Sequence, residues 1–203
     1  MSIHRPRAVV FDIGNVLLDF SYGKTVDRIK SRCKMNEAEL RELFGACDLF
    51  NRFESGELDS AGYFAEILNR TCFDGTLEEF GEMFGDIFTE VPEMVAWHEE
   101  LRQRDIPTFI LSNTNELSIR WIRQSYPFFK HFTGYVFSHE VGAMKPAARI
   151  YEAIEDMAKL RGPDLFYMDD REENVQGAAA RGWQAVHHAR PAQTIEIARS
   201  LGL

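Results

Sequence analysis

Five side chains that could perform chemistry are spread over most of the 203-residue sequence. They are Asp12, Ser112, Lys145, Asp169 and Asp170. A carboxylate can act as a nucleophile, oxygen ligands suit Mg²⁺, and a lysine with a hydroxyl can hold the oxygens of a transferring phosphoryl group. Three acids brought together would repel one another unless a cation lay among them. These residue types therefore indicate phosphoryl transfer assisted by Mg²⁺, provided that the fold brings them together.

Each of these residues also has an ordinary structural interpretation when it is taken alone. Asp12, which precedes Gly14, could simply cap a loop, and Ser112 could cap a helix. Lys145 and Asp170 could be solvated surface charges. The catalytic interpretation therefore depends on whether separate segments deliver these groups to one place.

The segments that carry these residues alternate between strand and helix patterns. Apolar runs predict strands at residues 8–11, 107–111, 134–138, 164–168 and 184–187. Helical patterns cover residues 95–104, 116–124, 146–160, 174–181 and 193–201. This alternation predicts an α/β fold, a three-layer Rossmann-like core with a mainly parallel sheet. Ligands of such sheets bind beyond the carboxyl ends of the strands, where Asp12, Ser112 and Asp169 are expected to lie.

The stretch after the first strand has a different character, because it is poor in strand patterns. Asn36 and Ser60 are positioned to cap helices, and Thr76 with Glu79 has the spacing of a capping box. Phenylalanine supplies much of the apolar face of these helices, and core packing is its expected role. The predicted division is a core of residues 1–20 and 91–203 with a small helical cap of residues 21–90 inserted after the first strand.

Composition and charge exclude several classes of function. Apolar residues make up 45% of the chain and charged residues 27%, which suits a packed globular protein. The net charge of −9 argues against a nucleic-acid partner or an anionic membrane surface. The sequence has no apolar signal core and no bilayer-spanning stretch, so a cytoplasmic location is expected. Cys33, Cys47 and Cys72 lack metal-ligand spacing and are expected to be reduced, packed thiols.

Four segments, taken together and in order, resemble the motifs of haloacid dehalogenase-superfamily hydrolases. They are residues 11–16, 111–115, 145–146 and 169–174. The Asp-x-Gly-Asn-Val, Leu-Ser-Asn-Thr-Asn and Lys-Pro-x-x-x-Ile-Tyr patterns resemble more closely the bacterial subgroup that includes glucose-1-phosphate phosphatase. The resemblance implies a Rossmann-like core with a small helical cap and a Mg²⁺-dependent phosphatase.

The resemblance also implies a role for each acid. Asp12 would be the nucleophile that forms an aspartyl-phosphate intermediate, and it would also bind Mg²⁺. The backbone carbonyl of Gly14 and the carboxylate of Asp170 would complete the protein ligands of the metal. Asp169 and Asn174 would lie behind these ligands, and the spacing from Asp170 to Asn174 matches the fourth motif.

Three further positions would bind the substrate. Ser112 and the amide of Asn113 would hold the phosphate, and Lys145 would orient both the phosphate and Asp12. The implied substrate is a small phosphorylated metabolite, with a sugar phosphate such as a sugar 1-phosphate as the leading candidate.

One departure from the family pattern leaves alternatives open. Most phosphatases of this superfamily carry a second aspartate, an acid and base, where this chain has Gly14. The enzyme could act on activated esters, recruit an acid from the cap or the substrate, or be a weak or non-catalytic phosphate-binding regulator. A 2-haloacid dehalogenase also lacks that aspartate, but the pair Asp169 and Asp170 favours Mg²⁺ and phosphate.

Four polar residues are given no role in the predicted site. Arg52 and Glu54 lie near a turn of the predicted cap and could face the substrate, although a surface ion pair is the favoured interpretation. His187 and His188 end the last predicted strand and could reach the site, and one of them is expected to face solvent.

Overall fold

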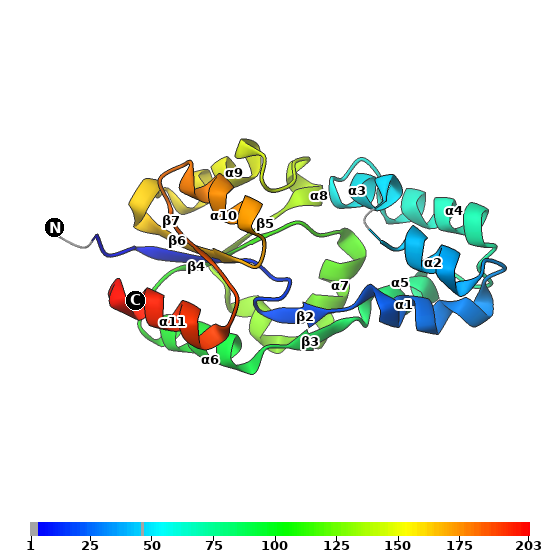
Figure 1. The fold of residues 1–203 in the computed structure, drawn as a ribbon, viewed down its shortest axis with the longest axis horizontal. Coiled ribbons are helices and arrows are strands. Elements are labelled where there is room, and N and C mark those ends of the chain that lie inside the picture. The colour runs from blue at the N-terminus through cyan, green and yellow to red at the C-terminus, as the bar shows by residue number, and fades with distance from the viewer. Residues whose placement is uncertain (1–3, 46) are drawn as a thin grey trace.

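A parallel five-stranded sheet forms the centre of the molecule. The computed structural model describes residues 4–45 and 47–203. The strand order is β5-β4-β1-β6-β7, and every neighbouring pair is parallel (Figure 1). The strands are β1 (Ala8–Phe11), β4 (Thr108–Ser112), β5 (Gly134–Phe137), β6 (Leu165–Asp169) and β7 (Gln184–His187). The predicted α/β class with a mainly parallel sheet is confirmed.

Helices cover both faces of this sheet, because the apolar residues of its strands are buried on both sides. On β1, Val9 and Phe11 join one core cluster, and Ala8 and Val10 join another. The first face packs against α6 (Pro92–Gln103), α7 (Glu116–Ser125) and α11 (Pro191–Ser200). The second face packs against α9 (Ala148–Ala158) and α10 (Glu172–Ala179). A short helix, α8 (Ser138–Val141), follows β5 directly.

The strand register brings the carboxyl ends of the three central strands together. Phe11 on β1 lies opposite Ile110 on β4 and Met168 on β6. The chain therefore leaves β1 at Asp12 beside the end of β4 and the end of β6, which is where the sequence predicted a site.

Five helices form a second part of the molecule beside the sheet, and we call them the cap helices. They are α1 (Tyr22–Ile29), α2 (Glu37–Leu43), α3 (Asp48–Glu54), α4 (Ser60–Thr71) and α5 (Leu77–Gly85). The capping box predicted at Thr76 is present at the start of α5, and Asn36, predicted to cap α2, does so and also forms a capping box with Glu39. The cap helices enclose their own apolar core and lie to one side of the sheet (Figure 1). The domain boundaries at residues 21 and 90 stay a prediction.

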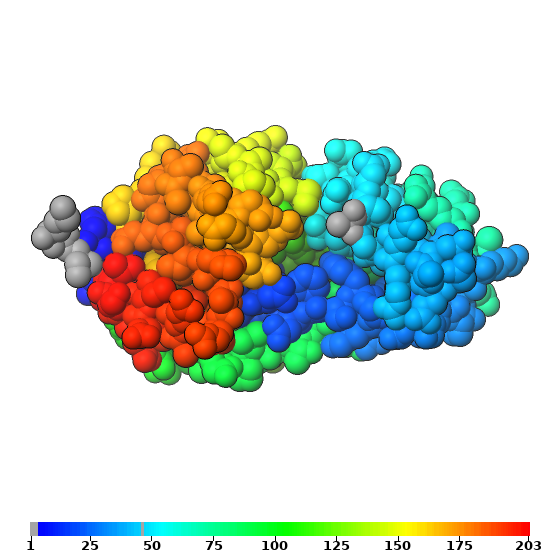
Figure 2. Space-filling model, in the orientation of Figure 1, coloured from blue at the N-terminus to red at the C-terminus, as the bar shows by residue number. Residues whose placement is uncertain are grey.

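An antiparallel ribbon that the sequence did not predict carries the chain to the cap helices and back. It consists of β2 (Leu18–Phe20) and β3 (Phe88–Glu90), with Asp19 opposite Thr89. Three-residue strands are too short to show a period of two, so the pattern of apolar residues carries no signal for them. The space-filling view shows the blue N-terminal segment passing between the two parts (Figure 2).

Direct contacts also join the cap helices to the sheet domain. Helix α5 packs along α7 so closely that a side chain on Gly85 would lie 2.5 Å from Cβ of Trp121. The hydroxyl of Ser60 donates a hydrogen bond of 2.5 Å to Glu116, the first residue of α7. The absence of a side chain at Gly85 is thus what lets these two helices approach.

The structure corrects three local predictions. Asp59 rather than Ser60 caps α4, since its carboxylate accepts a hydrogen bond from the amide of Gly62 at 2.7 Å. Helix α9 begins at Ala148 and not at Pro146, because the backbone between them is extended. Cys72 is exposed at the end of α4 and is not packed, while Cys33 and Cys47 are half-buried. The other predicted elements are present with ends displaced by a few residues.

Membrane insertion through a helix has no support in the described residues. Within residues 4–45 and 47–203, no helix combines the length and apolar composition that crossing a bilayer requires.

Phe84 is the centre of the core of the cap helices, and its truncation gives the first prediction. Its ring lies within 6.4 Å, centroid to centroid, of the rings of Tyr22, Phe44, Phe50, Phe53, Tyr63 and Phe80. We expect Phe84→Ala to lower the free energy of unfolding by about 3–5 kcal/mol, because it leaves a cavity among rigid rings. Urea denaturation measures this change.

The matched control for this prediction is Met157→Ala. Met157 is 46% exposed, so its truncation should change the free energy of unfolding by less than about 0.5 kcal/mol. Equal effects of the two substitutions would contradict the assignment of Phe84 as the packing centre.

Candidate functional site

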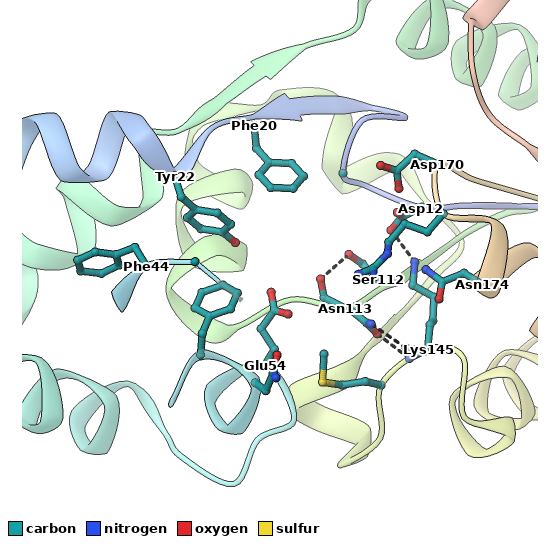
Figure 3. Close-up of a pocket in the computed structure, with 16 residues that line it drawn as sticks. Asp12, Phe20, Tyr22, Phe44, Glu54, Ser112, Asn113, Lys145, Asp170 and Asn174 are labelled. Atoms are coloured by element: carbon teal, nitrogen blue, oxygen red, sulfur yellow. Dashed lines mark hydrogen bonds and ion pairs between the residues drawn. The ribbon is translucent and has the colours of Figure 1, made fainter. Parts of the chain in front are cut away.

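A cavity of about 320 Å³ lies between the carboxyl ends of the strands and the cap helices. Its sheet side is polar and carries the predicted residues Asp12, Gly14, Ser112, Asn113, Lys145, Asp170 and Asn174 (Figure 3). Its other side is largely aromatic and is formed by Phe20, Tyr22, Phe44 and Phe50. All the predicted site residues thus line the cavity except Asp169, which is buried beneath the cavity wall and contacts Lys145 from there.

The polar side is organised around the buried ammonium group of Lys145. Its Nζ lies 2.8 Å from Asp12 Oδ1 and 2.6 Å from Asp169 Oδ2, and it donates to the carbonyl of Leu111 at 3.1 Å. The side chain of Lys145 is only 1% exposed. Burial would lower the pKa of Lys145, but the two carboxylates raise it above its usual value, so the group stays charged.

Asp169 is fully engaged by the protein and serves to hold Lys145. Beyond the ion pair, its carboxylate accepts hydrogen bonds from the hydroxyl of Tyr167, the amide of Arg171 at 2.9 Å and the side chain of Asn174 at 2.9 Å. Burial opposes ionisation, but Lys145 and these donors hold the pKa of Asp169 below its usual range. Asp169 is thus buried behind the cavity wall, whereas Asn174, which bonds to it, lines the cavity.

Asp170 points toward the cavity instead of into the protein (Figure 3). Its Oδ2 accepts a hydrogen bond of 2.8 Å from the side chain of Asn15, whose backbone is left-handed with φ of 53°. Asp12, Asp169 and Asp170 each offer an oxygen within 4.8 Å of the others. Three carboxylates therefore lie around one lysine, which leaves the cluster negative.

Burial and this charge imbalance both affect the titration of Asp12. Its pKa is raised from 3.8 to about 7, chiefly by burial and in part by Asp169 and Asp170, while Lys145 opposes the rise. The protonated form of Asp12 is a poor nucleophile, so the reaction needs the ionised form. A divalent cation held by Asp12, Asp170 and the carbonyl of Gly14 would favour the ionised form, and hard oxygen donors are the ligands that Mg²⁺ prefers.

Asn113 has a structural function that the sequence did not reveal. Its side-chain oxygen accepts from the backbone amide of Lys145 at 2.7 Å, and its side-chain nitrogen donates to the carbonyl of Lys145 at 3.1 Å. This paired bond ties the loop of Lys145 to the end of β4. Ser112, which precedes Asn113, is buried at the cavity wall, with its hydroxyl directed to the carbonyl of Asn113 at 3.3 Å.

The space beside Gly14 is occupied by an aromatic ring. A Cβ atom added at Gly14 would lie 2.8 Å from Cε1 of Phe20, a residue of the ribbon strand β2. Phe20 is 37% exposed and forms part of the cavity wall. A carboxylate side chain at position 14, as most superfamily phosphatases carry, would thus require this ring to move.

Glu54 is a functional candidate that the sequence pattern favoured as a surface residue, but its side chain is half-buried. The ion pair favoured for it is wrong, since Arg52 pairs with Glu57 at 3.6 Å and Glu54 turns into the cavity (Figure 3). Phe50, Asn51 and Glu54 all line the cavity, and their spacing places them on one face of α3. That helical spacing is the signal that could have identified Glu54.

The two histidines at the end of β7 do not line the cavity. His187 is exposed and contacts the backbone carbonyl of Asp170 at 2.8 Å through Nε2. His188 is buried, and its Nδ1 lies 2.8 Å from the hydroxyl of Thr194. The expectation that one of them faces solvent is confirmed.

The comparison with protein families decides the class of this site. A family model described as "Hydrolase: haloacid dehalogenase-like hydrolase" matches residues 6–182, which include every polar residue of the cavity's sheet side. The chain belongs to the haloacid dehalogenase-like hydrolases. It is therefore a hydrolase, as the motifs predicted.

Individual relatives of this haloacid dehalogenase-like hydrolase are distant but match over most of their length. A D-ribitol-5-phosphate phosphatase of Bacteroides thetaiotaomicron is 23% identical, over 87% of this chain and 88% of the relative. A sesquiterpene phosphatase of Aspergillus oryzae is 21% identical, over 89% of each. A crystal structure of a family enzyme from Bacteroides thetaiotaomicron, in complex with magnesium and inorganic phosphate, has a TM-score of 0.79, with 19% identity, and covers 89% of this chain and 93% of that one. This last likeness shows the fold.

The raised pKa of Asp12 predicts that Mg²⁺ stabilises this hydrolase in a pH-dependent way. The folded chain binds a proton at Asp12 between about pH 4 and pH 7, so stability falls as the pH rises through this window. At pH 8, Mg²⁺ at 100 times its dissociation constant should add about 2.7 kcal/mol, and at pH 5 proton competition should remove most of this gain. Thermal unfolding with Mg²⁺ and with chelator measures both values.

Two variants test the origin of this Mg²⁺ effect. Asp12→Asn should lose the shift of the unfolding temperature at pH 8. Asp156→Asn, which changes an exposed acid paired with Arg161, should keep it. Equal shifts at pH 5 and pH 8 in the wild-type protein would contradict the competition between proton and cation.

Proposed function

We propose that the protein is a Mg²⁺-dependent phosphatase acting on a small phosphorylated metabolite through an aspartyl-phosphate on Asp12. The observation that carries the proposal is the placement of Asp12, ion-paired at 2.8 Å to the buried Lys145, at the wall of a cavity beside Asp170. Two curated relatives named as phosphatases support the same chemistry. We also propose residues 21–90 as the cap and residues 1–20 and 91–203 as the core.

Each residue of the polar side would contribute a separate part of the reaction. The carboxylate of Asp12 attacks phosphorus, and Lys145 holds the attacking group in place while it offsets negative charge. Ser112 and the amide of Asn113 bind phosphate oxygens at the end of β4. Bound Mg²⁺, with Asp12, Gly14 and Asp170 as its protein ligands, would offset the charge that develops on the phosphoryl group.

The acid cluster favours phosphate over a haloacid as the substrate. Dehalogenation by the same nucleophile needs no metal, and a third carboxylate at Asp170 would then add only repulsion to the buried pair of Asp12 and Asp169. A bound cation would offset the repulsion among these carboxylates, and the site could then accept a phosphate. Asp170 is thus the residue that separates the two reactions.

The aromatic wall bears on the organic part of the substrate. Phe20, Tyr22, Phe44 and Phe50 offer flat apolar faces, which can contact a sugar ring or a hydrocarbon group. The curated relatives are named for a polyol phosphate and for sesquiterpene phosphate chemistry. We keep a sugar 1-phosphate as the first substrate to test, because its leaving group is activated.

A phosphate-release screen tests this proposal. Sugar phosphates, nucleotides and an aryl phosphate are assayed with Mg²⁺ and with chelator. We expect turnover only with Mg²⁺, and we expect Asp12→Asn to lower kcat by about 10⁴-fold or more, because it removes the nucleophile. The variant should unfold at no lower temperature than the wild type at pH 8 without Mg²⁺, since a costly buried carboxylate is removed.

Three outcomes would contradict the proposal. Substantial Mg²⁺-dependent turnover by Asp12→Asn would remove Asp12 as the nucleophile. Halide release from a 2-haloacid without metal would indicate a dehalogenase. Phosphate binding without turnover of any substrate would indicate a regulator.

A further inference from the structure

The proposed reaction needs two proton transfers that Asp12 and Lys145 do not supply. The leaving oxygen must gain a proton when its bond to phosphorus breaks, and the attacking water must lose one when the aspartyl-phosphate is hydrolysed. Gly14 offers no carboxylate for either transfer, and the ring of Phe20 fills the space beside it. The proton donor must therefore come from another wall of the cavity.

Among the described residues of the cap helices, Glu54 is the carboxylic acid that lies on that wall. It is the last residue of α3, and its carboxyl group points toward the space between the aromatic wall and Ser112 (Figure 3). Glu54 also lines the adjoining recess beneath the ribbon, which Gly14 and Phe20 share. Its carboxyl group therefore faces the same space that an acid at position 14 would face.

The backbone of Glu54 is fixed to the sheet domain, although its helix belongs to the cap. The hydroxyl of Ser138, at the start of α8, donates a hydrogen bond of 2.5 Å to the carbonyl of Glu54. Two residues later, Gly56 packs so tightly against His139 that an added Cβ would lie 2.2 Å from the His139 carbonyl. Gly56 has a φ of 78°, so both its conformation and its contact require glycine. These contacts set the position of Glu54 relative to Asp12.

We propose that Glu54 is the general acid and base of this enzyme, an inference that rests on the proposed phosphatase function. In the first step the bond from Asp12 to phosphorus forms, the bond to the leaving oxygen breaks, and that oxygen takes the proton of Glu54. In the second step water attacks phosphorus, its proton passes to the Glu54 carboxylate, and the bond to Asp12 breaks. Glu54 is then protonated again, and phosphate and an alcohol are the products.

The electrostatic surroundings of Glu54 suit both steps. The pKa of Glu54 is raised to about 7, because burial and, to a smaller extent, Asp12 raise it by more than Lys145 and Arg171 lower it. An acid with a pKa near the working pH can both give and take a proton. The groups that face it are Asp12, Lys145, Arg171, Tyr22 and Tyr63. Burial raises the pKa of both tyrosines, so they remain uncharged near pH 7.

The test compares two leaving groups in the Glu54→Gln variant. The control is Glu57→Gln, which changes an exposed acid on the same turn that pairs with Arg52. With an unactivated ester, such as an alkyl phosphate or a sugar phosphate of a primary hydroxyl, Glu54→Gln should lower kcat by about 10²–10⁴-fold, because the poor leaving group needs the proton. With p-nitrophenyl phosphate, the first turnover should stay within a few-fold of the wild type and be followed by slow steady-state release, because only hydrolysis of the aspartyl-phosphate needs the base.

The pH dependence of kcat/KM is a second measurement, and the substitution would leave its shape unchanged if Glu54 had only a structural role. The acid must be protonated, so wild-type kcat/KM for the alkyl or sugar phosphate should fall as the pH rises above about 7. Glu54→Gln should lose that fall, and Glu57→Gln should keep it. Circular dichroism and thermal unfolding establish that each variant is folded.

The outcomes separate this inference from the proposed function. If the wild-type protein releases no phosphate from any ester with Mg²⁺, the phosphatase function fails. If the wild type turns over but folded Glu54→Gln matches it with both leaving groups, the role of Glu54 is overturned. An equal loss of the first turnover with both leaving groups also overturns it, because that result indicates a binding or packing role.

Discussion

The site depends on one buried ammonium group that is shared by two carboxylates. Lys145 could not be removed from water without them, because a buried charge is stable only when it is paired and hydrogen-bonded. The surrounding fold supplies that pairing from three strands. Strand β1 delivers Asp12, β6 delivers Asp169, and the end of β4 holds the loop of Lys145 through Asn113. The pairing of the strands therefore also determines which charged side chains meet.

The same cluster explains why this part of the molecule suits chemistry rather than stability. One lysine cannot balance three acids. Burial, together with Asp169 and Asp170, raises the pKa of Asp12, whereas Lys145 and several hydrogen-bond donors satisfy Asp169. A cation and a phosphate complete the charge balance that the folded chain leaves open. The aromatic core of the cap helices has the opposite character, since it stabilises by packing alone and presents Tyr22, Phe44 and Phe50 to the cavity.

Most of the sheet and its polar edge could be predicted from the sequence, because both have strong local signals. Buried parallel strands are continuous apolar runs, and Asp12, Ser112 and Asp169 end such runs directly. The features that were missed arise from contacts between distant segments. The strands of the β2–β3 ribbon are too short to show an alternation of apolar and polar residues. The two hydrogen bonds between the Asn113 side chain and the Lys145 backbone join residues 32 positions apart. The orientation of Glu54 depends on Ser138, which lies 84 positions away.

The ring of Phe20 against Gly14 has a consequence for the history of such a site. A side chain at position 14 and a large aromatic at position 20 compete for the same volume, so selection cannot treat the two positions independently. A lineage that gains an acid at position 14 must also make room at position 20. One that enlarges position 20 gives up that acid and has to find its proton elsewhere. The residue at position 20 therefore bears on where the proton donor of this site can lie.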